Sequence, residues 1–403
     1  MQQKFAPDAG RAMSAARART GLGRWRSVPV GAGLGLVLVL LAGVGCTRSD
    51  GEGAAPARPA GANANEPTPI DGGNDDDTGG AGGQGGAADP ASVAADPSAG
   101  CAGVGPDIAR PGDEQVVLDV DGTERSYLRH VPPGYDGSTP VPLVLDIPGY
   151  AIEAELESGI SGMAAAGDTD GYVTVTPEAL GDPPHWNTRV DSPDVAFVDR
   201  ALDDLEGDLC LDRNRVFATG FSGGAFMSST LGCSLDDRIA AIAPVAGLRD
   251  MPDCDTERPV PVLAFHGTED TFLPYEGGMG PGLAALPSPD GSGGQLGDAL
   301  GADDSLVPGS LDEPVADIAG AWADRNGCEP EPDEGPVADD VTLVEFTCPA
   351  GAEVELYRVR GGGHTWPGSD GSANFDYVAG ATTFSVDATA LIWDFFTAHP
   401  RPG

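Results

Sequence analysis

Lysine is almost absent from this 403-residue chain: it occurs once, as Lys4, so nearly every positive charge is an arginine. Lysine and arginine together number 22 against 63 acidic residues, which gives a formal net charge of −41. This charge repels phosphate backbones and anionic membrane surfaces and therefore excludes nucleic acid as a partner. An acidic, lysine-poor surface is typical of salt-tolerant proteins, but a GC-rich genome explains the preference for arginine equally well.

Histidine and cysteine are also scarce, at five and seven residues. The cysteines include no C-x-x-C pair, the spacing typical of zinc sites, so we expect these cysteines to form no metal site. Six cysteines remain when Cys46 is set aside, and an even number outside the cytoplasm favours disulfides. The spacing alone does not choose among the possible pairings.

The N-terminal segment is typical of an export signal. Several basic residues precede an apolar run at residues 28–44. The run is roughly 17 residues long, short for a spanning helix, which needs about 20. Cys46 follows small residues as in a lipoprotein cleavage site, although Gly43 stands where leucine is usual. We predict a signal peptide over residues 1–46 and a lipid on Cys46; simple secretion and an uncleaved anchor are the alternatives.

Residues 47–100 consist mainly of glycine, alanine, proline, aspartate and asparagine. Such a segment has too few large apolar side chains to bury a core, and it predicts a disordered, flexible tether. The remaining residues, 101–403, number roughly 300, enough for a single large α/β domain.

This domain alternates between strand and helix patterns. Short apolar runs predict strands, and three-to-four spacing of apolar residues predicts helices. The predicted strands are 115–120, 124–131, 143–147, 172–175, 215–219, 239–244, 260–265 and 353–359, and the predicted helices are 152–166, 194–209, 225–231 and 387–397. The alternation predicts a doubly wound, mostly parallel sheet with helices on both faces. Residues 277–314 lack periodicity and predict a surface loop near the site.

Residues 220–224, Gly-Phe-Ser-Gly-Gly, match the nucleophile motif G-x-S-x-G. In a chain with 60 glycines the match alone is weak. Its context strengthens it, because a predicted strand precedes the motif and a predicted helix follows, as a nucleophile elbow requires. The pattern indicates Ser222 as a nucleophile, with a structural glycine-rich turn as the alternative.

A serine nucleophile needs a base that accepts its proton and a carboxylate that orients the base. His364 lies in a glycine-rich loop after the strand at 353–359, and Asp270 follows the strand at 260–265. The order Ser222, Asp270, His364 is that of α/β-hydrolases.

Other residues compete for these roles. His266 is a rival base, but it precedes the acid in the chain, and packing at a strand end is its favoured role. Glu269 is a rival acid beside Asp270. His130 and His399 are interpreted as surface or packing residues, and His185 is a candidate for the pocket wall.

Ester hydrolysis also needs donors for the oxyanion that develops on the carbonyl oxygen. We expect the backbone N–H of Gly223, directly after the nucleophile, to be one donor. The other is expected from the turn after the strand at 143–147, as the N–H of Tyr150, because Pro148 in that turn has none.

At these residues the chain resembles the extracellular polyhydroxybutyrate depolymerase and feruloyl esterase family of LpqC-like serine esterases. The resemblance covers roughly residues 98–399 and rests on ten stretches: 98–101, 125–127, 132–135, 186–187, 194–198, 220–224, 243–247, 265–270, 326–328 and 363–368. It implies an α/β-hydrolase fold with Ser222 as nucleophile, Asp270 as orienting acid and His364 as base. One departure is that relatives usually have His-Gly where this chain has Pro148 and Gly149.

The resemblance also implies three disulfides, Cys101–Cys210, Cys233–Cys254 and Cys328–Cys348. Trp186 and Trp366, in two of the matching stretches, are expected to line the substrate pocket. The implied substrates are esters of short hydroxy acids, or of hydroxycinnamic acids on plant polysaccharide.

We therefore predict a secreted or lipid-anchored serine esterase that acts on hydroxyalkanoate oligomers or short esters, without a cofactor. The only membrane contact expected is through the lipid at Cys46. A feruloyl or acetyl esterase acting on plant polysaccharide is the first alternative. A cell-surface binding protein on an inactive hydrolase scaffold is the second, motivated by the long tether and by Pro148.

Overall fold

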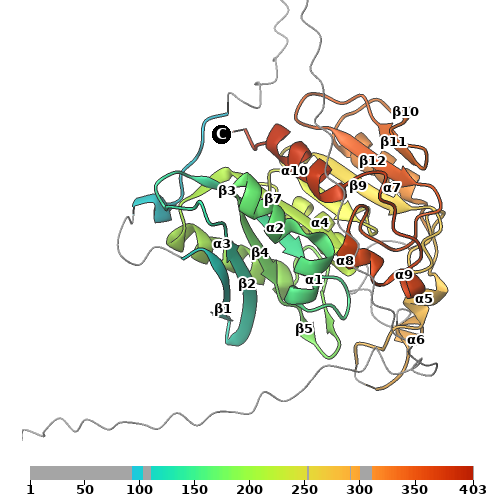
Figure 1. Cartoon of the computed structure of the whole chain (residues 1–403), viewed down its shortest axis with the longest axis horizontal. Coiled ribbons are helices and arrows are strands. Elements are labelled where there is room, and N and C mark those ends of the chain that lie inside the picture. Colours follow the sequence, from blue (N-terminus) through green and yellow to red (C-terminus); the bar gives the residue numbers. More distant parts are fainter. Residues whose placement is uncertain (1–92, 103–109, 252–253, 291, 300–310, 403) are drawn as a thin grey trace, which may run out of the picture. The chain divides into compact units, whose positions relative to one another are not determined.

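A mixed β-sheet runs through the part of the computed structural model that is described, residues 93–102, 110–251, 254–290, 292–299 and 311–402. Its strands are β1 Gly112–Val120, β2 Thr123–Val131, β3 Val141–Ile147, β4 Val173–Pro177, β7 Leu211–Phe221, β8 Ile242–Val245, β9 Val262–Gly267, β10 Asp333–Pro336, β11 Val341–Glu345 and β12 Val354–Val359. Among the described residues they lie in the order β1-β2-β4-β3-β7-β8-β9-β12-β11-β10 (Figure 1). The six central strands of this order, from β4 through β3, β7, β8 and β9 to β12, pair in parallel. The strands at the two edges, β1 and β2 on one side and β11 and β10 on the other, pair antiparallel with their neighbours. The sheet is mostly parallel, as predicted.

Helices cover both faces of this sheet. On one face, α1 Ala154–Ser161, α2 Met163–Asp170 and α10 Ala388–Ala398 contribute Ile160, Met163 and Phe396 to one buried cluster. On the other, α3 Pro193–Asp208, α4 Gly223–Ser234 and α7 Val315–Arg325 contribute Leu205, Leu231 and Trp322 to a second. Side chains of β3 alternate between the two clusters, which is the layering of a doubly wound α/β-hydrolase fold.

The shorter elements are η2 Ala99–Ala102, β5 Leu180–Gly181, β6 Pro184–His185, α5 Pro281–Ala284, α6 Leu296–Ala299, α8 Asp370–Ala373 and α9 Asp376–Ala379. The sequence analysis predicts none of these, nor α7, β10 and β11. The helix predicted at 152–166 is two helices, because Gly162 adopts φ 69° and ends α1 with a left-handed cap. The strand predicted from residue 239 begins only at Ile242.

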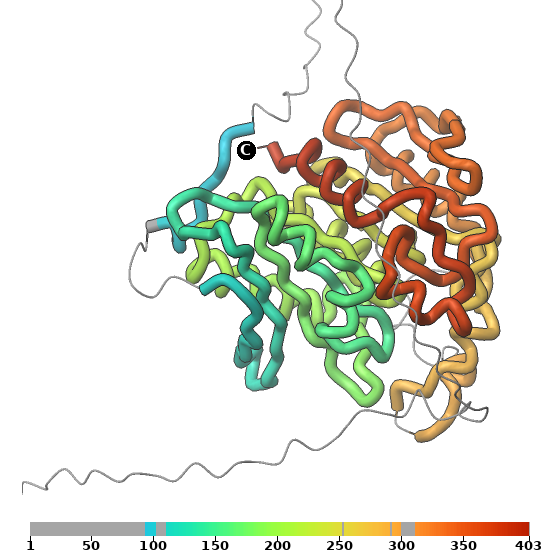
Figure 2. Tube along the Cα trace, in the orientation of Figure 1, coloured from blue at the N-terminus to red at the C-terminus, as the bar shows by residue number. Residues whose placement is uncertain are grey.

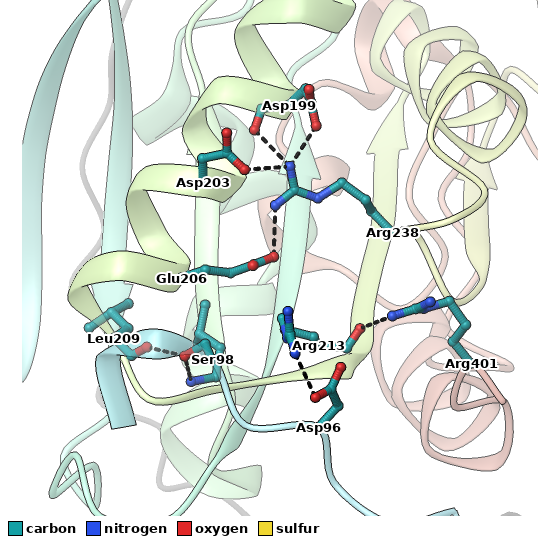
Figure 3. Close-up of polar contacts among 10 residues, drawn as sticks. Asp96, Ser98, Asp199, Asp203, Glu206, Leu209, Arg213, Arg238 and Arg401 are labelled. Carbon is teal, nitrogen blue, oxygen red and sulfur yellow. Dashed lines mark hydrogen bonds and ion pairs between the residues drawn. The ribbon is translucent and has the colours of Figure 1, made fainter. Parts of the chain in front are cut away.

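The segment 93–100 packs on the domain, which corrects the tether boundary predicted at residue 100. Ser98 Oγ donates to Leu209 O (2.5 Å), and Asp96 pairs with Arg213 at 2.7 Å (Figure 3). Arg401, near the C-terminus, donates to the carbonyl oxygen of the same Arg213. The two ends of the described chain therefore meet at the start of β7 (Figure 2). This segment has few large apolar side chains, and its contacts are polar. An analysis based on apolar residues therefore could not detect that it packs on the domain.

The same close-up shows how α3 is attached to the turn after α4. Arg238 contacts Asp199 at 2.5 Å, Asp203 at 2.9 Å and Glu206 at 2.7 Å (Figure 3). These acids lie one helical turn apart, so one guanidinium spans the exposed side of α3.

Three disulfides are present among the described residues: Cys101–Cys210, Cys233–Cys254 and Cys328–Cys348. They are the pairs that the resemblance implies. The first attaches the N-terminal segment to the end of α3, the second joins α4 to the loop after β8, and the third ties the end of α7 to the loop before β12. Disulfides are typical of proteins in oxidising compartments.

The predicted signal peptide, Cys46 and most of the predicted tether lie outside the described residues. Within the described ranges, no helix combines the length and apolarity needed to cross a membrane.

Candidate active site

Ser222 occupies the sharp turn between β7 and α4. Its backbone angles, φ 56° and ψ −116°, are strained for a residue with a side chain. Its N–H donates to Val245 O at 2.9 Å, which ties the turn to the end of β8. A strained strand-to-helix turn of this kind exposes the serine hydroxyl at the carboxyl edge of the sheet.

Glycines allow this turn to pack directly on the backbone of β3. A Cβ atom added to Gly224 would lie 1.9 Å from Ile147 O, and one added to Gly220 would lie 2.7 Å from the same oxygen. After β8, a Cβ on Gly247 would lie 2.5 Å from Ser222 O. Because the obstructing atoms belong to the backbone, no rotation of a side chain relieves these contacts. The G-x-S-x-G pattern therefore has a steric cause in this fold.

Asp270 and His364 come from the loops after β9 and β12, which are neighbouring parallel strands. His364 Nδ1 lies 2.7 Å from Asp270 Oδ2. Asp270 Oδ1 accepts hydrogen bonds from the N–H groups of Phe272 (2.7 Å) and Leu273 (2.9 Å). Burial alone raises the pKa of Asp270, but the charge and hydrogen bond of His364 outweigh it, and the pKa is lowered. An ionised, firmly held carboxylate thus orients the imidazole.

The imidazole of His364 lies between two aromatic rings. Its centroid is 4.9 Å from that of Phe221 and 4.8 Å from that of Phe272, which stacks on it. Its backbone N–H donates to Ala379 O at 2.6 Å. Since Phe221 directly precedes Ser222, the imidazole lies beside the nucleophile turn. In the described structure no hydrogen bond joins Ser222 Oγ to His364; such bonds often tighten only when substrate binds.

Two backbone N–H groups adjoin the nucleophile. A Cβ on Gly223 would lie 3.1 Å from Tyr150 N, so the two backbones are adjacent. Among the hydrogen bonds of the described residues, neither N–H donates to a protein acceptor. Unpaired N–H groups beside a nucleophile suit a developing oxyanion.

The rival base and acid lie elsewhere. His266 is buried, with Nε2 2.8 Å from Leu273 O and 3.4 Å from Asp270 Oδ2. Burial lowers the pKa of His266, so it packs as a neutral neighbour of the acid. The side chain of Glu269 is exposed, and within the described structure it makes no bond to His364.

The other histidines are distributed over the domain. His130 pairs with Asp113 and Asp168 at the surface, and His399 Nε2 lies 2.9 Å from Glu353. The ring centroid of His185 lies 6.0 Å from that of Tyr150, so His185 is near the site.

The prediction that Trp186 and Trp366 line a pocket is wrong, because their side chains are buried, with 3% and 0% exposure. Trp186 Nε1 donates to Pro148 O at 2.8 Å, and Trp366 Nε1 donates to Thr389 Oγ1 at 3.0 Å. Burial of the apolar ring with its N–H paired is the favourable state of an indole. Both indoles therefore pack in the interior of the domain and do not line a pocket.

The half-buried aromatic residues at the site are instead Tyr150 and Phe272, which the sequence analysis does not assign to a pocket. The available signal was that Tyr150 is itself the predicted oxyanion donor and that Phe272 lies two residues after Asp270 in the chain. They pack in an apolar cluster with side chains of the insertion at 277–314, including Leu283 and Leu296. Tyr150 Oη also donates to Pro287 O at 2.7 Å. The described part of the insertion thus lies near the site, as predicted.

Comparison with known proteins identifies esterases. No protein-family model matches the chain. Feruloyl esterase B of Piromyces equi is 29% identical over 265 residues, which cover 63% of this chain and 45% of that protein. NocK of Nocardia uniformis subsp. tsuyamanensis, whose name gives it as an esterase, is 30% identical over 291 residues, 68% of this chain and 80% of NocK. Feruloyl esterase D of Neurospora crassa is 30% identical over 197 residues, covering 46% and 65%.

Two of the similar solved structures are titled esterases. Acetyl xylan esterase from Aspergillus awamori aligns with a TM-score of 0.45 at 13% identity, covering 66% of this chain and 100% of that one. A thermostable esterase aligns with a TM-score of 0.36 at 22% identity, covering 41% and 48%.

Proposed function

The chain belongs to the α/β-hydrolase esterases related to NocK and the feruloyl esterases, and from this we propose that it hydrolyses carboxylic esters through an acyl-enzyme on Ser222. The observation that carries the proposal is the 2.7 Å bond between His364 and Asp270 beside a strained serine turn. The chain spans less than half of feruloyl esterase B, so the activity is proposed from the site itself.

The geometry supports a two-step reaction. His364 Nε2 accepts the proton of Ser222 Oγ as the oxygen attacks the carbonyl carbon of the ester. The N–H groups of Gly223 and Tyr150 then donate to the oxyanion, and the imidazolium gives its proton to the departing alcohol. In the second step His364 takes a proton from water, the hydroxide attacks the acyl-enzyme, and the carboxylic acid leaves as Ser222 regains its proton.

We place esters of hydroxycinnamic acids first among substrates. Two relatives are named feruloyl esterases, and the half-buried rings of Tyr150 and Phe272 beside the catalytic groups suit an aromatic acyl group. Hydroxybutyrate oligomers, the class that the sequence analysis ranks first, become the second. The three disulfides and the predicted export signal support action outside the cytoplasm, with a lipid on Cys46 as the proposed attachment.

The test is hydrolysis of methyl ferulate and of 3-hydroxybutyrate oligomers by residues 47–403. Ser222→Ala is expected to lower kcat by at least about 10³-fold, because removal of a triad nucleophile leaves only the catalysis of binding and the oxyanion hole. Ser228→Ala is the matched control: the same change, in the helix that follows the Ser222 turn, removes only a hydroxyl that donates to Ala225 O. Ser228→Ala should keep the wild-type rate.

If the wild type cleaves neither substrate nor any short-chain ester, the proposal fails. The binding protein on a hydrolase scaffold then becomes the better explanation. Equal loss in both serine variants would also contradict the role of Ser222.

A further inference from the structure

Two carboxyl groups that the proposed reaction does not use lie buried behind the turn that carries Tyr150. Asp146 on β3 and Glu157 on α1 are both 0% exposed. Asp146 Oδ2 accepts from Ser161 Oγ at 2.6 Å, and Glu157 Oε2 accepts from the N–H of Gly149 at 3.2 Å. The other oxygen of each, Asp146 Oδ1 and Glu157 Oε1, is buried without a hydrogen-bond partner among the described residues. Burial of two adjacent acids has a large cost unless they share a proton.

Their environment favours such sharing. Burial raises the pKa of Glu157 well above its ordinary value, and the charge of Asp146 raises it further. Burial likewise raises the pKa of Asp146, to about 7, against the opposing bond from Ser161. The surroundings of Glu157 therefore favour its neutral form.

Glu157 also contacts the one backbone donor available between β3 and Tyr150. Pro148 has no N–H, so Gly149 carries the first N–H after the strand. A side chain at Gly149 is excluded, since a Cβ would lie 2.9 Å from Ile152 Cδ1 and 3.1 Å from Phe221 O. The N–H of Gly149 therefore points to Glu157 from a turn that is closely packed against the nucleophile strand.

Hydrogen bonds within the domain pair the other backbone polar groups around Tyr150. Pro148 O accepts from Trp186 Nε1, Gly149 O accepts from the N–H of Ile152 at 3.2 Å, and the N–H of Ala151 donates to Pro184 O at 2.8 Å. Together with Glu157, these bonds hold the turn on both sides of the unpaired N–H of Tyr150.

We propose that Glu157 is a positioning residue of the oxyanion hole: its buried carboxyl group accepts from the N–H of Gly149 and so fixes the direction of the Tyr150 N–H. The inference rests on the proposed esterase function. It explains how a turn that begins with Pro148, which has no N–H of its own, is held in place by its next residue.

The test compares three substitutions of Glu157 with a control in the same network. Glu157→Gln keeps the acceptor for Gly149, because an amide oxygen also accepts, and should keep kcat within about twofold. Glu157→Met removes the acceptor for Gly149, and Glu157→Asp keeps an acid but is one methylene too short. Both should lower kcat on the order of 10- to 100-fold with little change in KM, since a misplaced oxyanion donor affects the transition state.

Ser161→Ala is the control, because it removes an equally buried hydrogen bond of the same network without touching Gly149. It should lower thermal stability and leave kcat near the wild-type value. Amide hydrogen exchange over residues 149–151, which needs no substrate, should accelerate at least tenfold in Glu157→Met and remain slow in Glu157→Gln.

An unchanged kcat and unchanged exchange in Glu157→Met would overturn the inference. So would equal losses of kcat in Ser161→Ala and Glu157→Met, because the loss would then follow general destabilisation. If Glu157→Met does not fold, Glu157→Asp supplies the same comparison. If the wild type hydrolyses no ester, the proposed function fails, and the exchange rates alone decide whether Glu157 fixes the turn.

Discussion

Replacement of Asp270 by asparagine tests the catalytic arrangement most directly. The amide oxygen of the substituted side chain can still accept from the N–H groups of Phe272 and Leu273, so the turn should keep its shape. The amide nitrogen then faces His364 Nδ1, where Asp270 Oδ2 lies 2.7 Å away in the wild type. An N–H donor at that position selects the tautomer with its proton on Nε2, and this tautomer cannot accept the proton of Ser222.

The expected loss is large because the wrong tautomer removes general base catalysis while leaving the fold intact. By analogy with the same change in other serine hydrolases, kcat should fall by about 10⁴-fold, equivalent to roughly 5 kcal/mol in the activation barrier. The assay is steady-state hydrolysis of methyl ferulate, with circular dichroism and thermal melting as checks on folding. The substitution should leave the melting temperature nearly unchanged.

Glu269→Gln provides the matched control, since it makes the same chemical change at the adjacent residue, whose side chain is exposed. It should alter kcat by no more than about twofold. A loss smaller than tenfold in Asp270→Asn, or a larger loss in Glu269→Gln, would refute the assignment of Asp270 as the orienting acid.

Three further predictions concern stability. Burial raises the pKa of Asp146 to about 7 and raises the pKa of Glu157 well above its ordinary value, so both bind protons more tightly in the folded state than in the unfolded state. Their contribution to stability is therefore complete below the ordinary carboxyl pKa near 4, and the part due to Asp146 is lost as pH rises through about 7. Urea unfolding at several pH values should show a stability that falls as pH rises in the wild type and a weaker dependence in the double variant Asp146→Asn, Glu157→Gln; equal dependences would contradict the prediction. Removal of residues 93–100 eliminates the bonds of Ser98 and should reduce the free energy of unfolding by about 1–3 kcal/mol while kcat is retained; an unchanged urea midpoint would restore the boundary at residue 100. Replacement of Cys328 and Cys348 by serine should cost about 2–5 kcal/mol in urea unfolding, and no measurable loss would show that the disulfide does not constrain the unfolded chain.

The sequence predicted a helix or strand correctly where a regular spacing of apolar residues marks that element. The helix at α3 was predicted within one residue at each end because its apolar residues keep a regular spacing. In the structure Ser192 caps its start. Alternating strands and helices predicted the parallel sheet. The helix α7 was missed although Val315, Ile318 and Trp322 keep helical spacing, because it directly follows a long insertion without periodicity.

In the candidate site too, some residues could be selected from the sequence and others could not. Residue types and chain order were enough to select Ser222, Asp270 and His364, because only five histidines exist and each candidate follows a strand. Tryptophan identity suggested a pocket role for Trp186 and Trp366, yet burial of a tryptophan depends on which elements pack over it. The sequence cannot supply that information.

By itself the sequence determined the fold class, the G-x-S-x-G motif and the order of the candidate catalytic residues, since these depend on periodicity and on short motifs. Only the tertiary structure brought Asp146 and Glu157 together behind the oxyanion turn, from β3 and α1. It alone also decided that Gly149 donates to Glu157 and that the N–H of Tyr150 is left unpaired among the described residues. The physical reason is that burial and hydrogen-bond pairing depend on neighbours across elements, which no local pattern in the chain specifies.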